Sequence, residues 1–132
     1  MFKKAKWRKA VKKAKTTRKK LRDQLDKLVS KIVRIRAGYK CERCGKTSPL
    51  NTAHIFSRRN LSVRWDMENI LCCCVGCHFW GHQNPILFAE YVKEKLGNKK
   101  YEDLKVKANQ VKKWTIPELE ELLKEFKEIK SE

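Results

Sequence analysis

The sequence has no long apolar run, because Lys and Arg interrupt every hydrophobic stretch. Nothing in it approaches the roughly 20 apolar residues that a transmembrane helix needs. Its N-terminus also lacks the apolar core and the small-residue cleavage site of a secretory signal. These absences predict a protein with no membrane partner, and we expect it in the cytoplasm.

Acidic residues are scarce at the start of the chain. Residues 1–38 hold 16 Lys and Arg but only Asp23 and Asp26, a net charge of +14, whereas residues 39–132 have a net charge of +4. Clustered Lys and Arg gain affinity for nucleic acid by releasing its condensed counterions. DNA is therefore the predicted partner. Anionic lipid is the competing interpretation, because a basic amphipathic helix can lie on a membrane surface.

Glycine and proline are absent from residues 1–37, so nothing there prevents a long helix. Apolar residues then recur at helical spacing and mark one buried face: Leu21, Leu25, Leu28, Val29, Ile32, Val33 and Ile35. Gly38 is a natural stop for this helix. Residues 1–16 lack such a stripe and carry charges that repel, so we expect them to fray when no DNA is bound.

The middle of the chain predicts a β-hairpin followed by a helix. Turn-forming residues punctuate positions 39–84, which favours short strands and turns. We expect the strands over Asn51–Phe56 and Glu68–Cys73, and the helix over Cys77–Gln83. With helices on both sides, this pattern predicts a small α+β protein.

Helices are expected to fill the C-terminal part of the chain. One is predicted over Pro85–Leu96 and another over about 100–113. Thr115 and Glu118 form a candidate capping box before the last helix. We divide the chain into a basic N-terminal helical arm at 1–38, a zinc-bound core at 39–84 and a helical region that packs on this core at 85–132.

Six cysteines in a reducing compartment favour metal binding over disulfides. Each CxxC turn presents two thiolates, and two turns complete the tetrahedral site of a structural zinc ion. The chain has two such pairs, 29 residues apart: Cys41 with Cys44, and Cys74 with Cys77. A glycine relieves the steric strain of a tight turn because it has no Cβ atom. The glycines expected to do so are Gly45 and Gly76.

Two further cysteines leave an alternative open. Cys73 could replace Cys74 as a ligand, although its spacing to Cys77 would then become CxxxC. On an alternating strand, Cys72 and Cys74 point to one side and Cys73 to the other. We interpret Cys72 and Cys73 as core residues and Cys74 as the ligand.

All three histidines lie within the zinc-bounded stretch. His54 is expected on the first strand, where an imidazole could accept a proton from water near neutral pH. Asn69 could hold the opposite ring nitrogen through its side-chain carbonyl. His78 and His82 lie one helical turn apart, so their imidazoles can form half of a divalent metal site. His78 has a rival role as a zinc ligand in place of a cysteine.

The segment from Cys41 to His82 resembles the HNH nuclease motif on a treble-clef (ββα-metal) scaffold. The matching residues read CERCG, AHIFSRRN and RWDMENILCCCVGCHFWGH. The resemblance implies that His54 is the general base and that Asn69 orients it. It also implies that His78 and His82 bind the catalytic metal ion. Among HNH proteins, the segment is similar to the phage-encoded NinG-type recombination endonucleases.

This resemblance implies a metal-dependent DNA endonuclease that uses Mg²⁺ or Mn²⁺ in a bacterial or phage-infected cell. HNH proteins usually place Asp or His directly before the base as another metal ligand, whereas this chain has Ala53. Waters and a DNA phosphate would then complete the metal shell. Asp66 could substitute as a ligand, although the family has none at that position.

Basic and aromatic residues flank the motif. Three arginines are candidate phosphate contacts: Arg58, Arg59 and Arg64. Solvated side chains, or side chains paired with Asp66, are the alternative. Trp65 and Trp80 could stack on a distorted base, but core packing is their expected role.

Two other classes of function stay open. A non-catalytic zinc module that binds nucleic acid would explain why an acid is missing at Ala53. A structural protein that forms a homodimer through its helices would explain the apolar stripe at 21–35. The second class leaves the histidines and Asn69 without a role.

Overall fold

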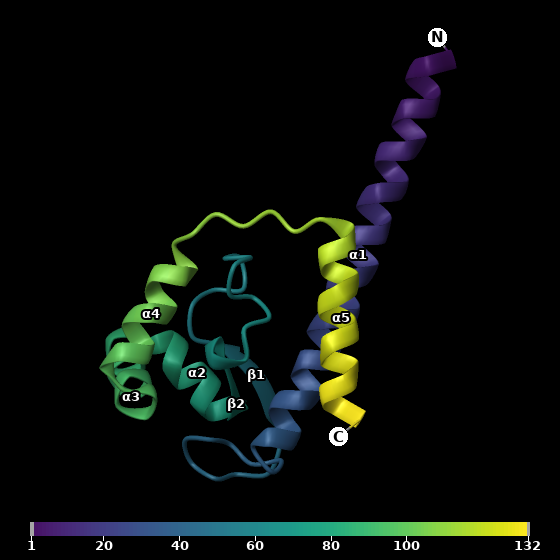
Figure 1. Cartoon of the computed structure of the whole chain (residues 1–132). Helices are drawn as coiled ribbons and strands as arrows, with labels where there is room; N and C mark the ends of the chain where they lie inside the picture. Colours follow the sequence, from purple (N-terminus) through teal and green to yellow (C-terminus); the bar gives the residue numbers. More distant parts are fainter. Residues whose placement is uncertain (1, 132) are drawn as a thin grey trace. The chain divides into compact units, whose positions relative to one another are not determined.

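The computed structural model describes residues 2–131 and has five α-helices and one two-stranded antiparallel sheet (Figure 1). The chain is therefore a small α+β protein, as the sequence predicts. It forms two compact units. Unit 1 comprises Met1–Leu28 with Trp114–Glu132, and unit 2 comprises Val29–Lys113. The elements in chain order are α1 (Phe2–Arg36), β1 (Leu50–His54), a 3₁₀ turn (Met67–Asn69), β2 (Ile70–Cys74), α2 (Val75–Gln83), α3 (Pro85–Leu96), α4 (Asn98–Ala108) and α5 (Ile116–Ser131).

Helix α1 is continuous from Phe2 to Arg36. The prediction that residues 1–16 fray is therefore wrong from Phe2 onward; Met1 lies outside the described residues. High helix propensity explains the difference, because this stretch is rich in Ala, Lys and Arg. Gly38 ends the helix as predicted, with a φ of 65° that favours glycine. No described helix, α1 included, is long and apolar enough to cross a membrane.

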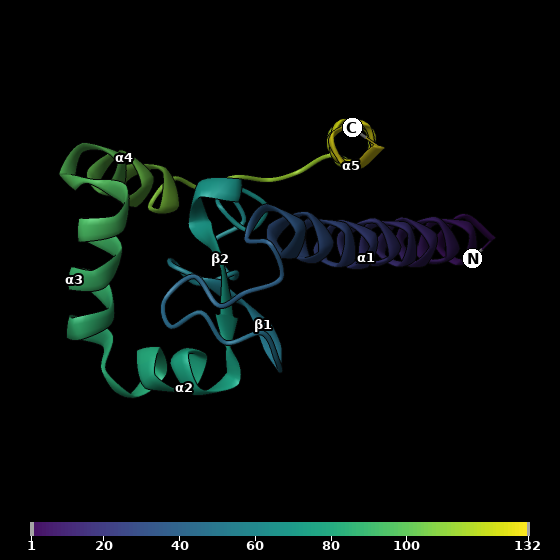
Figure 2. The ribbon, with the colours of Figure 1, turned by 90° about the horizontal axis from the view of Figure 1, so that it is seen from below.

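Unit 1 combines the N-terminal part of α1 with α5, which lies alongside it in both ribbon views (Figures 1 and 2). The predicted capping box is confirmed. The Thr115 amide donates to Glu118 Oε1 at 3.1 Å, and the Glu118 amide donates to Thr115 Oγ1 at 3.3 Å. The predicted stripe on α1 is buried from Leu21 to Val33, whereas Ile35 at its end is 49% exposed. The buried apolar residues on the two helices of the unit include Leu21, Leu25, Leu28, Leu119, Leu123 and Phe126.

Unit 2 is built on the β1–β2 hairpin, in which Leu50 pairs with Cys74 and His54 pairs with Ile70. The second strand starts two residues later than predicted, because Met67–Asn69 forms a 3₁₀ turn. Asp66 caps this turn by accepting a hydrogen bond from the Glu68 amide at 3.0 Å. All five residues of β2 are buried, so this strand is the centre of the unit.

Three helices surround the hairpin. Helices α2, α3 and α4 border it on successive sides (Figure 2). Helix α3 has the predicted bounds, whereas α2 starts two residues early and α4 runs over Asn98–Ala108, short of the predicted end. At the corner between α2 and α3, a Cβ atom at Gly81 would lie 3.0 Å from the Phe88 ring. Glycine therefore permits this close packing.

The end of α1 is bonded to the hairpin of unit 2. Arg36 donates to the carbonyls of Met67 at 2.8 Å and Ile70 at 2.7 Å. Six residues earlier on α1, Ser30 shares a hydrogen bond of 2.7 Å with Thr52. The boundaries of the two units therefore differ from those of the three predicted regions. Helix α1 contributes to both units, and α5 belongs to the same unit as the N-terminal part of α1.

Candidate functional site

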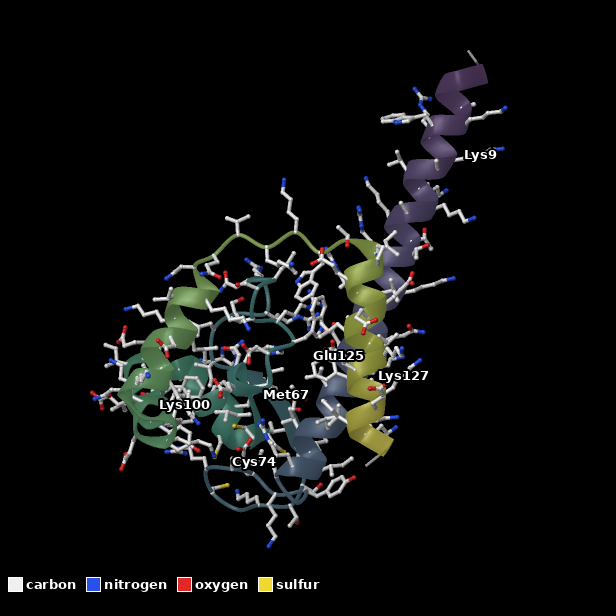
Figure 3. All side chains as sticks on the ribbon, viewed as in Figure 1. Lys9, Met67, Cys74, Lys100, Glu125 and Lys127 are labelled. Carbon is white, nitrogen blue, oxygen red and sulfur yellow. The ribbon has the colours of Figure 1, made fainter. Side chains whose placement is uncertain are left out.

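Four cysteine sulfurs lie close together beside the start of α2, whose N-cap residue is Cys74 (labelled in Figure 3). They belong to the two predicted pairs, Cys41 with Cys44 and Cys74 with Cys77, and their sulfurs all lie within 4.8 Å of one another. Cys44 Sγ and Cys74 Sγ lie 3.5 Å apart. Zn–S bonds of about 2.3 Å place tetrahedral sulfurs roughly 3.8 Å apart. The cluster could therefore hold a structural zinc ion.

Backbone geometry explains how each pair presents its sulfurs. The amide of the second cysteine donates to the sulfur of the first, at 3.5 Å in Cys41–Cys44 and 3.3 Å in Cys74–Cys77. Gly45 has a φ of 82° and supplies the predicted conformational freedom. The prediction for Gly76 is wrong, because this residue lies in α2, where a Cβ atom would make only an ordinary contact of 3.9 Å with Cys74 Sγ.

The pKa shifts distinguish Cys41 and Cys74 of the cluster from the core cysteines Cys72 and Cys73. Burial raises the pKa of Cys73 to about 12 and also raises the pKa of Cys72, so both remain neutral thiols. Burial acts the same way on Cys41, but backbone hydrogen bonds outweigh it and lower the pKa of Cys41 to about 6. At the other extreme, burial raises the pKa of Cys77 to about 12. A backbone hydrogen bond also lowers the pKa of Cys74, so the thiolate form is favoured at Cys41 and Cys74.

Arg43 links the cysteine cluster to α2. Its guanidinium donates to Cys77 Sγ at 3.4 Å and lies 3.5 Å from the centroid of the Trp80 ring. The hydrogen bond with Cys77 raises the pKa of Arg43, and Arg43 in turn opposes the burial that raises the pKa of Cys77. Arg43 thus covers one face of the Trp80 ring, so Trp80 has a packing role.

The two histidines of α2 form a pair. Nε2 of His78 lies 3.2 Å from Nε2 of His82. Two nitrogens bound to one ion at about 2.1 Å would lie roughly 3 Å apart, so the pair could share a divalent cation. Burial, with the neighbouring His82, lowers the pKa of His78 and favours the neutral ring that binds metals. On its other edge, His78 Nδ1 lies 3.2 Å from the side-chain amide of Asn51.

No third ligand joins this pair among residues 2–131, where the four cysteines form the sole cluster of three or more potential metal ligands. Ala53 is buried in the core at 2% exposure and offers no ligand atom. Asp66 is engaged elsewhere, because its carboxylate caps the 3₁₀ turn and pairs with Lys107 at 2.6 Å. The structure also gives no support to His78 as a zinc ligand, since cysteines alone make up that cluster.

His54 lies at the end of β1, about 10 Å along the strand from Asn51 at 3.3 Å per residue. Its Nε2 is 3.0 Å from the backbone carbonyl of Arg64. A carbonyl only accepts hydrogen bonds, so Nε2 carries the hydrogen and Nδ1 of the neutral ring carries the lone pair. The ring is thus oriented by a backbone carbonyl. The prediction that the side chain of Asn69 does this directly is wrong.

Asn69 instead fastens the loop between the strands. Its side chain is fully buried, at 0% exposure. Oδ1 accepts from the Phe56 amide at 2.8 Å, while Nδ2 donates to the carbonyls of Phe56 at 2.9 Å and Val63 at 3.1 Å. The next residue, Arg64, supplies the carbonyl that orients His54. Asn69 therefore positions His54 indirectly, through the loop.

Replacing Asn69 with Ala is expected to destabilise the protein strongly. The Phe56 amide and carbonyl would lose their partner, while the Val63 carbonyl would keep only the Asp66 amide, and each orphaned group costs about 1–3 kcal/mol. We expect the free energy of unfolding to fall by about 3 kcal/mol or more in zinc-loaded protein. Urea denaturation would measure this, with Asn84→Ala as the control, because Asn84 Nδ2 bonds a single carbonyl, that of Trp80. Equal losses in the two variants would contradict the assigned role.

The three arginines predicted to contact phosphate lie in the loop between β1 and β2. Arg58 and Arg59 are exposed, and Arg64 is half-buried with its guanidinium 5.3 Å from the centroid of the Trp65 ring. Trp65 itself is buried at 3% exposure, which confirms core packing. The exposed pair stays a prediction as phosphate contacts.

Two contacts at the site were not predicted. Asn51 lies two residues before Ala53 and so shares its face of an alternating strand, a signal that the sequence does contain. The bond from Arg43 to Cys77 joins residues 34 positions apart, and no local pattern marks it.

The family described as Bacteriophage Lambda NinG protein matches residues 2–131. No curated protein and no solved structure matches the chain. The matched region runs through both units and contains the cysteine cluster, the histidine pair and Asn69 with its loop. This chain is therefore a member of the NinG family of bacteriophage proteins.

Proposed function

We propose that this protein is a metal-dependent DNA endonuclease of the HNH type, with His54 as the general base. The observation that carries the proposal is the arrangement of the three histidines on one hairpin and helix. His54 is oriented with a lone pair on Nδ1, and His78 and His82 present two nitrogens 3.2 Å apart. These are the two functions that hydrolysis of a phosphodiester needs, a proton acceptor and a place for a cation.

The proposed scaffold for this activity is a treble clef held together by a zinc ion. One CxxC pair precedes β1 and the other starts α2, so a shared zinc ion would join the two ends of the hairpin unit. Cys74 also caps α2, because its sulfur accepts from the Cys77 amide. Zinc would thus fix the start of the helix that carries the histidine pair.

In the proposed reaction, His54 takes a proton from water through Nδ1 while the water oxygen attacks phosphorus in line. The Arg64 carbonyl, which accepts from Nε2, stabilises the imidazolium that forms. The bond from phosphorus to the 3′ oxygen breaks, and that oxygen takes a proton from a second water molecule and ends as a hydroxyl. A Mg²⁺ or Mn²⁺ ion at the histidine pair would stabilise the developing negative charge. Since Ala53 supplies no ligand, water and phosphate oxygens would fill the other positions.

DNA affinity is proposed to come from the basic part of α1. Residues 2–16 contain eight Lys and Arg, and positions 5–10 are all exposed. Each neutralised phosphate contributes about 0.9 to the slope of log K against log salt, so deleting residues 2–16 should flatten this slope by several units, up to about 7. Fluorescence anisotropy at several salt concentrations would measure it, with zinc content as the folding control. An unchanged slope would place the DNA surface elsewhere.

Incubation with supercoiled plasmid tests the proposed activity. Zinc-loaded wild type should nick the plasmid when Mg²⁺ or Mn²⁺ is added and should not nick it without either ion. His78→Ala should abolish nicking with zinc content intact, whereas extra metal should partly restore nicking by His82→Ala. If no cation supports cleavage of duplex, branched or single-stranded DNA, the protein is a non-catalytic binding module. The missing ligand at Ala53 is the observation that favours this second candidate.

A further inference from the structure

Asn51 contacts the histidine pair without belonging to the general base or its loop. We propose that Asn51 is a positioning residue that holds Nδ1 of His78 through its side-chain amide, so that Nε2 faces the position of a cation. The inference rests on the proposed metal site at the pair. Asn51 thereby supports the proposed metal site from β1, the strand on which Ala53 offers no metal ligand.

The contacts of His78 place Asn51 behind the site. Nδ2 of the Asn51 amide lies 3.2 Å from Nδ1 of His78, whereas Nε2 of His82 lies 3.2 Å from Nε2 of His78. These nitrogens lie on different edges of the imidazole, so Asn51 does not compete for the position between the two histidines. Metal-binding histidines typically bond a second group through the other ring nitrogen, and that group fixes the tautomer.

The amide of Asn51 can serve both neutral tautomers of His78. When Nδ2 donates to Nδ1, the ring hydrogen resides on Nε2, and His78 cannot bind a cation through Nε2. When the amide turns by half a rotation, Oδ1 accepts from Nδ1–H and the lone pair moves to Nε2. Asn51 thus keeps Nδ1 bonded in either form, and the second form is the one that binds metal.

Two substitutions at Asn51 separate this role from simple packing. Asn51→Asp keeps only acceptors and should hold the hydrogen on Nδ1, whereas Asn51→Leu retains the bulk and offers neither donor nor acceptor. Thr52→Val is the matched control, because Thr52 is the next residue on β1 and bonds Ser30 on α1 instead. ¹⁵N NMR of the zinc-loaded, full-length protein would report the hydrogen position on His78.

Mn²⁺ titration followed by electron paramagnetic resonance supplies the second readout, with His78→Ala as the baseline. Manganese prefers nitrogen and oxygen ligands over thiolates, so the cysteine cluster does not interfere. Asn51→Leu should bind Mn²⁺ about 10–100-fold more weakly, the usual effect of losing a supporting residue. Asn51→Asp should bind at least as tightly as wild type with the hydrogen on Nδ1, and Thr52→Val should match wild type.

Unchanged Mn²⁺ affinity in Asn51→Leu would overturn the inference, as would ¹⁵N shifts of His78 that are the same in all variants. A failure of the proposed function has a different signature. In that case wild type and His78→Ala would bind Mn²⁺ equally, while the ¹⁵N shifts of His78 would still decide whether Asn51 sets the tautomer.

Discussion

Replacing Cys74 with Ala is expected to release zinc and unfold the hairpin of unit 2, whereas Cys73→Ala should keep the zinc. A structural zinc ion contributes about 10–16 kcal/mol of apparent binding free energy in zinc-finger peptides, which matches or exceeds the total stability of most domains. Cys74 supplies one of the four clustered sulfurs and also caps α2, so its loss affects both the metal and the helix.

Cys73 is a matched control because it is adjacent and equally buried, yet its sulfur is not among the four that lie within 4.8 Å of one another. Its thiol stays neutral, and its truncation leaves a small cavity that costs about 1 kcal/mol. Metal analysis of the purified proteins and amide hydrogen exchange of β2 would measure the difference. Equal loss of zinc in both variants would contradict the ligand assignment.

Local patterns predicted much of the fold. The two CxxC pairs and the Thr115–Glu118 box depend on residues three positions apart, and the structure forms both. The bounds of α3 follow from Pro85 and Gly97, which punctuate the chain whatever surrounds them. Each of these features is decided by near neighbours.

The sequence patterns did not predict contacts between residues that are far apart in the chain. Nothing local marks that Arg36 bonds the hairpin carbonyls of Met67 and Ile70, or that α5 joins the start of α1. Residues 1–16 show a different difficulty. Charge repulsion and helix propensity act there in opposite directions, and the propensity of Ala, Lys and Arg prevails in the structure.

Asn69 shows how far the candidate site could be predicted. Its residue type and position indicated a role in orienting the base, but the predicted bond to the imidazole does not form. A 3₁₀ turn at Met67–Asn69 places the side chain inside the loop, where it bonds Phe56 and Val63. The Arg64 carbonyl then orients His54, and a backbone group of this kind has no side-chain signature.

Removing the imidazole of His54 should reduce the nicking rate about 10²–10⁴-fold, the usual cost of losing a positioned proton acceptor. Zinc content and DNA affinity should stay near wild type, because the cysteine cluster and the basic residues of α1 are untouched. Asn69→Ala should also reduce the nicking rate, but indirectly, because Asn69 acts on His54 through the loop. The substitution also lowers the stability of the protein.

The decisive comparison is the metal-dependent nicking rate of wild type, His54→Ala and Thr52→Val on supercoiled plasmid, at equal zinc content. Thr52→Val alters the same strand and should nick at close to the wild-type rate. His54→Ala should lose at least about 100-fold while binding DNA with unchanged affinity. Nicking by His54→Ala at the wild-type rate would contradict the assignment of His54 as the general base.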